Sequence, residues 1–531
     1  WLVLAELLRL ATMLLLTLSL VPLSRGAMVQ NVTISDVVVP LFGGLRVGEY
    51  YAKIEVGEPP VEYRVQIDTG SSLLLIPDAA CDGCTLREGG ATYAAVKSTT
   101  ALPLPCTSPQ CGVQTCSSSL CFSSVCSREK QACCSEKSPT DCAFGVHYGG
   151  GTEAQGALVS DTVRIGSVTT RLTFGRILAE RGRWEASLGV DGILGIGLKA
   201  LGCDPTCVDP LLYELVADRV LHDGFSTCMG DGSGQLVMGG VDPRFYTPPL
   251  QFTPLVKPLG TTKLTYYSVA FTDVRLGEKS VFGHADSSSS SSSAMSYDTT
   301  AVVDSGSTSL LFARNIFDAI QASFQRDYCH LPGVCATPSV IAEPANGGIQ
   351  GARPCLRAMP LASEWPTLQL ELGPSLTLHL PPHLYFVRAG SDFCYGIDAT
   401  PASAGNINIF GDTLLRGFYT VYDHTNLRVG FAQQNMLLCG FPGPGGVNKI
   451  SPAMDTLPAW ASPTLLLLTV PLSLLYALAS CFLVGRIASS PGEAGANGGS
   501  RHAWNFQRVA RYESRQPPPG VSSYQKGEEA N

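Results

Sequence analysis

Charged residues are scarce in this 531-residue chain, and the basic ones form no stripe. Lysine, arginine, aspartate and glutamate make up 15% of the residues, with 36 basic against 44 acidic side chains. Nucleic-acid binding normally requires positive charge clustered on one face, so this balance argues against a nucleic-acid partner. Hydrophobic residues reach 45%, which excludes a disordered protein and allows a large core.

Long apolar runs are also scarce, and the two that occur lie near the ends of the chain. The first covers residues 13–23 and is followed by small residues. This order is typical of a secretory signal peptide, which we assign to residues 1–27. The second covers residues 464–484, has no charge and precedes Arg486. It is long enough to cross a bilayer as one helix, with a buried core helix as the alternative.

These two runs predict a single-pass type I membrane protein whose main body lies outside the cytosol. A stalk rich in glycine and proline, at 441–463, would precede the span, and residues 485–531 would form a cytoplasmic tail. We expect the body to face the lumen of the ER, Golgi or endosome, or the cell exterior. The short N-terminal segment 28–46 carries a glycosylation sequon at Asn31.

Cysteines are numerous, and their distribution favours an oxidising compartment. Of nineteen, eighteen precede residue 440, and ten lie in the segment 81–142. That segment has too few large apolar residues to form a core without covalent links, so five local disulfides are the simplest interpretation. The alternative is a zinc site, although the segment contains no histidine. Its ligands would be Cys81, Cys84, Cys133 and Cys134.

Between the two membrane signals, the sequence consists mostly of short apolar segments interrupted by glycine and proline, as in residues 50–60. Such segments predict β-strands. Helix candidates are few, at 209–221 and 313–327. We therefore expect an all-β fold with two lobes.

One short sequence occurs twice. Residues 65–75 read VQIDTGSSLLL, and residues 302–311 read VVDSGSTSLL. Each copy is an apolar strand that leads into an aspartate, a hydroxyl residue, a glycine and a second hydroxyl residue. A single Asp-Thr-Gly or Asp-Ser-Gly indicates only a turn. The matched pair predicts two similar lobes that bring Asp68 and Asp304 together across a cleft.

Two neighbouring carboxyl groups can catalyse hydrolysis. Within hydrogen-bonding distance they cannot both ionise at moderate pH, so they share one proton. The ionised member can take a proton from water while the protonated member polarises a peptide carbonyl. Asp68 and Asp304 are therefore predicted to hydrolyse peptide bonds without a metal or a cofactor.

The residues after each aspartate suit this chemistry. The first hydroxyl can hydrogen-bond across a pseudo-twofold axis, and the glycine allows a sharp turn and a close backbone approach. The second hydroxyl can donate a hydrogen bond to the carboxylate. These supporting residues are Thr69, Gly70, Ser71, Ser305, Gly306 and Ser307.

With these motifs the chain resembles the pepsin-like aspartic proteases over residues 50–439. The segment 142–152 is similar to the family's flap hairpin, with Tyr148 and Gly149 at the part that closes over substrate. Two further segments are similar to the strands that thread beside the catalytic loops, at 191–197 and 407–412. The resemblance implies a bilobal, monomeric acid protease with its active-site cleft between the lobes, acting on proteins or peptides.

The resemblance also implies domain boundaries and disulfides. The lobes would span 47–225, with the insertion at 81–142, and 226–440. The cysteine-rich insertion after the first aspartate is similar to that of the nepenthesin and plasmepsin V branch. The expected C-terminal membrane anchor is similar to that of plasmepsin V and the beta-secretases. The implied pairs are Cys228–Cys439 and Cys355–Cys394. Two further expected pairs join cysteines that are close in sequence, Cys203–Cys207 and Cys329–Cys335.

Three features depart from the family pattern. Leu75 stands where many pepsin-like enzymes have a tryptophan that bonds the flap tyrosine, so Tyr148 is expected to be held differently. Gly149 and Gly150 stand where plasmepsin V has a cysteine and a glutamate, so its substrate preference does not carry over. The segment 28–46 is short for an inhibitory propeptide, which predicts light trimming or none.

We therefore expect a membrane-tethered aspartic endopeptidase that hydrolyses peptide bonds of secretory-pathway proteins. Two other functions are compatible with the sequence. One is a catalytically silent pepsin-fold binding protein, a type that commonly lacks an aspartate or its glycine. The other is a cysteine-rich adhesion receptor, which depends on the insertion alone.

Overall fold

The computed structural model describes twelve stretches of the chain between residues 36 and 441. They are 36–45, 48–111, 126–127, 132–149, 151–182, 189–202, 207–258, 263–282, 299–335, 355–373, 376–402 and 405–441. Residues 1–448 form one compact unit and residues 449–531 a second. Only the first unit contains described residues.

Several predicted features lie outside the described residues. They are the signal peptide at 1–27, Asn31, the stalk at 441–463 beyond its first residue, the apolar run at 464–484 and the tail at 485–531. Among the residues that are described, no helix is both long enough and apolar enough to span a bilayer.

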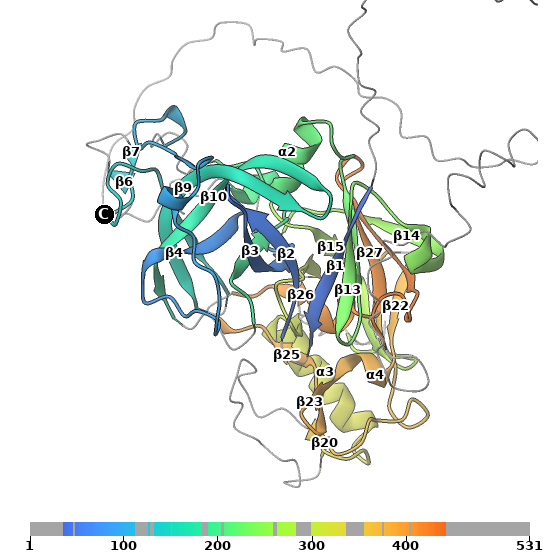
Figure 1. The fold of residues 1–531 in the computed structure, drawn as a ribbon. Coiled ribbons are helices and arrows are strands. Elements are labelled where there is room, and N and C mark those ends of the chain that lie inside the picture. Colours follow the sequence, from blue (N-terminus) through green and yellow to red (C-terminus); the bar gives the residue numbers. More distant parts are fainter. Residues whose placement is uncertain are drawn as a thin grey trace, which may run out of the picture. The chain divides into compact units, whose positions relative to one another are not determined.

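A large sheet contains strands from both lobes (Figure 1). Its strands are β1 (Val37–Gly44), β2 (Glu49–Val56), β3 (Val61–Asp68), β4 (Leu74–Asp82), β5 (Leu102–Pro103), β8 (Ala143–His147), β9 (Glu153–Ile165), β10 (Val168–Arg181), β11 (Gly192–Gly195), β12 (Phe225–Met229), β13 (Ser233–Met238), β14 (Tyr246–Pro254), β27 (Phe418–Asp423) and β28 (Arg428–Gln434). Their order is β14-β28-β27-β12-β13-β1-β2-β3-β11-β4-β10-β9-β5, and β8 pairs with β9.

Four smaller sheets complete the described β structure. Their strands are β6 (Cys126–Ser127), β7 (Ala132–Cys133), β15 (Ser268–Ala270), β16 (Asp273–Leu276), β17 (Lys279–Ser280), β18 (Thr300–Val303), β19 (Leu310–Phe312), β20 (Cys355–Leu356), β21 (Leu368–Glu371), β22 (Thr377–Leu380), β23 (Phe386–Ala389), β24 (Asp392–Tyr395), β25 (Ile397–Ala399) and β26 (Asn408–Phe410). The sheet orders are β15-β18-β26-β19-β25, β17-β16-β21-β22, β20-β24-β23 and β6-β7. The described chain is therefore mostly β, as the sequence predicts.

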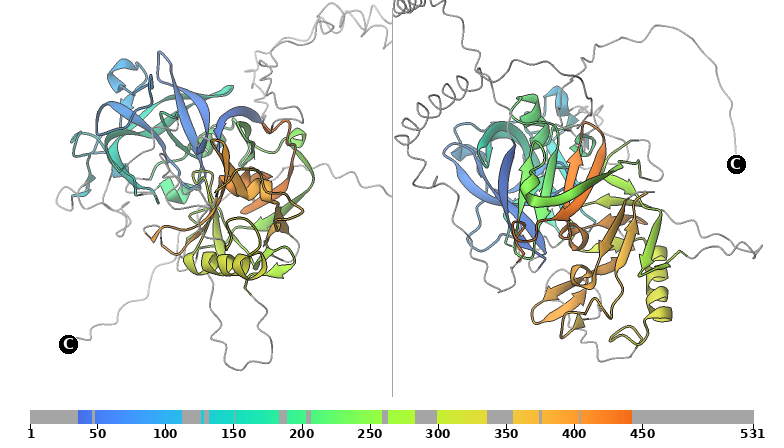
Figure 2. Two further views of the ribbon diagram at one scale, coloured as in Figure 1. Left: turned by 90° about the horizontal axis from the view of Figure 1, so that it is seen from below. Right: turned by 90° about the vertical axis from the view of Figure 1, so that its right-hand side faces the viewer.

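The described α-helices are few and short. They are α2 (Leu211–Ala217), α3 (Arg314–Asp327), α4 (Pro382–Tyr385) and α5 (Asp412–Leu415). The first two lie inside the predicted segments 209–221 and 313–327. In α3, Ile316, Ile320 and Phe324 recur every four residues and are buried, which explains why this helix packs beside the strands of the second lobe (Figure 2).

Two strands of the large sheet lie at boundaries expected from the sequence. Residues 37–44, placed by the sequence in the N-terminal extension 28–46, form β1, which lies between β13 and β2. The expected lobe boundary at 225/226 falls inside β12, which pairs with β13 and β27. Both strands pair within the large sheet, and sequence periodicity does not reveal such pairing.

Beside each aspartate turn, a third strand lies between the strand before the turn and the strand after it. In the first lobe, β11 runs parallel to β3 and antiparallel to β4. In the second lobe, β26 runs parallel to β18 and antiparallel to β19. A Cβ on Gly195 would come within 2.5 Å of the Leu73 nitrogen, so glycine allows β11 to lie this close to the turn.

Disulfides cross-link both the insertion and the body. Within the insertion they join Cys81–Cys84, Cys106–Cys134 and Cys111–Cys142. In the body they join Cys228–Cys439, Cys329–Cys335 and Cys355–Cys394. Cys133 and Cys207 are also disulfide-bonded, whereas Cys203 lies outside the described residues. All four cysteines of the alternative zinc site are thus engaged in disulfides, which removes the thiolates that such a site needs.

Candidate active site

The first aspartate turn lies at the end of β3. Val65 and Ile67 are fully buried, which fixes the strand and delivers Asp68, only 4% exposed, to its end. The backbone nitrogen of Gly70 donates to Asp68 Oδ1 at 2.8 Å, and the Ser71 hydroxyl donates to Oδ2. Both carboxyl oxygens are therefore held by local donors.

The second turn repeats this arrangement after β18. The nitrogen of Gly306 donates to Asp304 Oδ1 at 2.9 Å, and the Ser307 hydroxyl donates to Oδ2 at 2.7 Å. Asp304 is partly buried, so it is more accessible than Asp68.

Buried hydroxyls join the two turns. The Thr69 nitrogen donates to Ser305 Oγ at 3.2 Å, and the Ser305 nitrogen donates to Thr69 Oγ1 at 2.9 Å. Each hydroxyl then donates to the opposite strand, Thr69 to the Val303 carbonyl at 2.9 Å and Ser305 to the Ile67 carbonyl at 2.7 Å. These reciprocal bonds hold the strands that carry Asp68 and Asp304 side by side.

The glycines face the opposite carboxyl groups. A Cβ on Gly70 would contact the carboxyl group of Asp304, and a Cβ on Gly306 would contact that of Asp68. The two carboxyl groups therefore lie close together because both turns carry glycine.

The electrostatics of the pair favour one shared proton. Burial, followed by the negative charge of Asp304, raises the pKa of Asp68 to about 7, while the hydrogen bonds from Ser71 and Gly70 act in the opposite direction. At mildly acidic pH a proton therefore remains on the pair. Within the described residues, no three His, Cys, Asp or Glu side chains converge as metal ligands.

The predicted flap is a hairpin of β8 and β9, paired from Ala143–Ala157 to His147–Glu153. At its tip the Tyr148 nitrogen donates to the Thr152 carbonyl at 2.9 Å. Burial and the charge of Asp68 raise the pKa of the Tyr148 phenol, and a hydrogen bond with Ser71 opposes this. The tyrosine thus lies over the first turn.

Tyr148 has apolar and polar contacts. Its ring packs beside an apolar cluster that includes Leu73 and Leu75, and its hydroxyl interacts with Ser71. Gly149 follows in the hairpin tip, whereas Gly150 lies outside the described residues. Cys142, at the base of the flap, is tied to Cys111 of the insertion.

A third carboxyl group, not singled out from the sequence, lies behind the second turn. Asp412 is fully buried at the start of α5, and its nitrogen donates to the Ser307 carbonyl at 2.8 Å. Burial, and then the charges of Asp304 and Glu49, raise its pKa well above the usual value. Neither of its carboxyl oxygens has a hydrogen-bond partner among the described residues. The available signal was an acidic residue ending an apolar buried strand.

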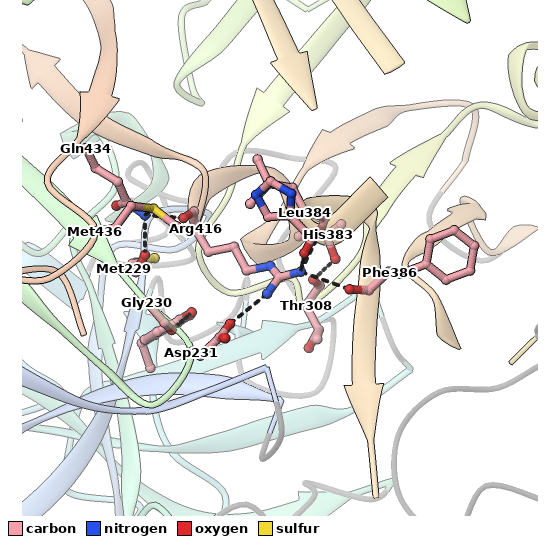
Figure 3. A network of polar contacts seen from close by, with 12 residues as sticks. Met229, Gly230, Asp231, Thr308, His383, Leu384, Phe386, Arg416, Gln434 and Met436 are labelled. Carbon is pink, nitrogen blue, oxygen red and sulfur yellow. Dashed lines mark hydrogen bonds and ion pairs between the residues drawn. The ribbon is translucent and has the colours of Figure 1, made fainter. Parts of the chain in front are cut away.

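Arg416, one helical turn further on, anchors this region (Figure 3). It is 5% exposed and pairs with Asp231 at 2.8 Å. Its other terminal nitrogen donates to the carbonyls of His383, Leu384 and Phe386. Because buried guanidinium groups need such partners, this residue fixes the end of α5 against α4.

The site can be compared with known proteins. The family model for eukaryotic aspartyl proteases matches residues 49–434. Aspartic proteinase 36 of Arabidopsis thaliana is 25% identical, covering 76% of this chain and 78% of that protein. Gastricsin of Cavia porcellus is 26% identical, covering 72% and 79%. Cathepsin D of Mus musculus is 23% identical, covering 78% and 88%. The chain therefore belongs to the eukaryotic aspartyl proteases and is an aspartic-type endopeptidase.

Proposed function

We propose that this protein is a membrane-tethered endopeptidase that hydrolyses secretory-pathway proteins with a water activated between Asp68 and Asp304. The observation that carries the proposal is the reciprocal hydrogen bonding of Thr69 and Ser305, which brings the two carboxyl groups together. The paired glycines are required for the same contact.

The proposed mechanism assigns different tasks to the two aspartates. Burial raises the pKa of Asp68 to about 7, so Asp68 carries the shared proton and donates it toward the substrate carbonyl oxygen. Asp304 accepts a proton from the attacking water, which adds to the carbonyl carbon. The proton on Asp304 then passes to the leaving amine as the C–N bond breaks, and one hydroxyl of the tetrahedral intermediate returns its proton to Asp68 as the carboxylic acid forms.

The supporting residues keep the carboxyl groups in place during this cycle. Ser71 and Ser307 each donate to one carboxyl oxygen, which leaves the other lone pairs for water and for the neighbouring aspartate. Tyr148 lies over the first turn, where it excludes bulk water when a peptide is bound.

The cellular setting is part of the proposal. Disulfides in both the insertion and the body support a secretory compartment. Residues 464–484 are the proposed membrane anchor, with the protease body lumenal or extracellular and acting as a monomer. The ten-cysteine insertion supports placement in the nepenthesin and plasmepsin V branch.

The proposal is tested on the full chain in detergent. We expect peptide cleavage at about pH 4 to 6.5, blocked by a statine-type transition-state mimic and abolished by Asp68→Ala and by Asp304→Ala. Asp318→Ala, on the exposed face of α3, is the matched control and should cleave normally. Undiminished cleavage in either dyad variant would reject the mechanism. Ligand binding without cleavage would favour the silent or adhesion function.

Membrane tethering has its own test. The chain should resist extraction by alkaline carbonate, and truncation after residue 441 should release an active, soluble protease. A chain that starts at Met28 should be active with light trimming or none. Complete inactivity of that chain until cleavage would contradict the proposed absence of a long prosegment.

A further inference from the structure

A buried histidine lies away from the dyad, between an aspartate and a tyrosine. His424, 7% exposed, follows β27. Its Nδ1 is 2.8 Å from Asp223 Oδ1, and its Nε2 is 2.6 Å from the Tyr267 hydroxyl. The ring lies nearly parallel to those of Tyr213 and Tyr267, with ring centroids 5.3 and 5.6 Å away. Two hydrogen-bonding partners and two aromatic neighbours therefore fix its orientation.

Tyr267 connects this histidine to both catalytic strands. Its hydroxyl donates to the Ile196 carbonyl at 2.9 Å, and the Ile196 nitrogen donates to the Asp68 carbonyl at 2.8 Å. On the other side, the Val303 nitrogen, next to Asp304, donates to the Tyr267 carbonyl at 2.9 Å. Tyr267 is 1% exposed. One residue thus holds the backbone beside each aspartate.

Counting protons along this chain of contacts shows that two states are possible. The Asp223 carboxylate needs a hydrogen on Nδ1 of His424, because two acceptors would otherwise face each other. The Tyr267 hydroxyl has a single hydrogen. If that hydrogen goes to the Ile196 carbonyl, Nε2 must also carry a hydrogen, and the Asp223–His424 pair holds one extra proton. If Nε2 carries none, the Tyr267 hydrogen goes to Nε2 and the Ile196 carbonyl loses its donor.

We propose that His424 is a positioning residue for the catalytic strands, and that its doubly protonated form frees the Tyr267 hydroxyl to hold the Ile196 carbonyl. The strand that ends at Asp68 is then held most firmly at acidic pH. Loss of the Nε2 proton weakens this hold, because the Tyr267 hydrogen then goes to Nε2 and leaves the Ile196 carbonyl. This inference rests on the proposed function, because it assigns the held strand to the catalytic site.

The surroundings of His424 allow this titration to be isolated. The titratable groups that face the ring are Asp223, Tyr213 and Tyr267, and Tyr422 packs on Tyr267. Phe225 contributes an uncharged ring edge. The carboxylate of the adjacent Asp423 is taken up by Arg428 and Asn426. The two ring nitrogens of His424 therefore hydrogen-bond to Asp223 and Tyr267.

Two substitutions separate positioning from mere packing. His424→Gln donates to Asp223 and accepts from Tyr267, so it mimics the singly protonated state at every pH. Tyr267→Phe removes the hydroxyl and keeps the ring. We expect His424→Gln to lower kcat about threefold to tenfold at about pH 4.5 with KM unchanged, the effect of one lost hydrogen bond.

The pH dependence of that ratio is the decisive measurement. The ratio of wild-type to His424→Gln kcat should fall toward one as pH rises, because a wild-type ring that has lost the Nε2 proton makes the same hydrogen bonds as the glutamine. Adding His424→Gln to Tyr267→Phe should cause no further loss. His330→Gln, at an exposed histidine, is the matched control and should leave the ratio at one throughout. A ratio that stays constant with pH would reject the positioning role.

A readout independent of activity separates this inference from the proposed function. In the full chain with ¹⁵N-labelled histidine, the ring signals absent from His424→Gln should show both nitrogens protonated at the acidic end of a pH series and only Nδ1 at its alkaline end. A ring that keeps one proton throughout the series would overturn the inference even if the dyad is catalytic. Cleavage that survives Asp68→Ala would reject the proposed function and leave this titration as a structural result.

Discussion

Asp68 and Asp304 accept the same pair of hydrogen bonds, from a glycine nitrogen two residues on and a serine hydroxyl three residues on. The residues behind the two turns are different. Behind the first turn the threading strand continues into apolar Ile196, which is 4% exposed. Behind the second turn it continues into Asp412, whose carboxyl group is fully buried. Asp68 is also more deeply buried than Asp304.

This difference shows that similar local sequences do not make the two carboxyl groups equivalent. Hydrogen bonds from neighbouring residues fix the geometry of each turn, and those bonds are the same in both. Burial and the charges beyond the turns differ, because the surrounding strands come from different parts of the chain. The dyad is therefore symmetric in local geometry and asymmetric in its surroundings.

The largest expected effect is on stability, and it comes from a substitution in the region behind the second turn. Arg416→Met should lower the free energy of unfolding by about 3–5 kcal/mol, because three buried carbonyls lose their charged donor. Denaturant unfolding of the full chain measures this loss. Arg388→Met, at an exposed arginine, is the control and should change stability little. Equal stability of the two variants would show that Arg416 does not anchor α5.

The next effect tests the symmetry of the turns. Gly70→Ala and Gly306→Ala should each lower kcat/KM about 100-fold, because each Cβ meets the opposite carboxyl group and displaces it. Both variants should keep the wild-type circular dichroism spectrum. Steady-state cleavage assays measure the loss. A large loss at one turn only would mean that the two turns do not approach each other symmetrically.

The third effect tests the raised pKa of Asp68 through the pH dependence of the free energy of unfolding. The pKa of Asp68 rises from 3.8 to about 7 in the folded chain. The folded state therefore binds more protons than the unfolded state in this window, and the free energy of unfolding falls as pH rises through it. Asp68→Asn removes this term. It should be more stable than the wild type by roughly 1–3 kcal/mol at about pH 8 and no more stable at about pH 3.

Denaturant titrations at both pH values provide this measurement. An Asp68→Asn variant whose advantage is the same at both pH values would show that the gain does not come from ionisation. A variant that is less stable at the higher pH would contradict the raised pKa of Asp68.

The smallest expected effect is a shift in the pH dependence of the aspartate pair. The hydrogen bond from Ser71 lowers the pKa of Asp68, so Ser71→Ala should move the alkaline limb of the kcat/KM profile to higher pH. Activity at the optimum should fall about threefold to tenfold, because the same hydroxyl also meets Tyr148. Ser391→Ala, at an exposed serine, is the control. An alkaline limb that does not move would separate Ser71 from the titration of the pair.

Much of the site could be predicted because its signals are local. The order of aspartate, hydroxyl, glycine and hydroxyl lies within four residues, and each copy follows an apolar strand. The sequence also predicted α2 and α3, since helical segments show in short stretches of chain. The pairing of β12 with β27 was not predicted, because β27 lies almost 200 residues further along the chain.

Other parts of the site could not be predicted from the sequence. Asp412 begins α5 just after a short strand, and its proximity to Glu49 and Asp304 depends on the position of β26 between β18 and β19. His424 resembles any histidine at the end of a strand. Its partners Asp223 and Tyr267 lie about 200 and 157 residues away in sequence.

The sequence by itself determined the chemistry, because two matched carboxyl turns with glycine and hydroxyl neighbours suit one kind of hydrolytic dyad. The tertiary structure decided how the two carboxyl groups differ. Burial, the third carboxyl group at Asp412 and the link through Tyr267 all depend on contacts between distant strands. Proton affinity responds to the summed environment in space, and no stretch of sequence contains that environment.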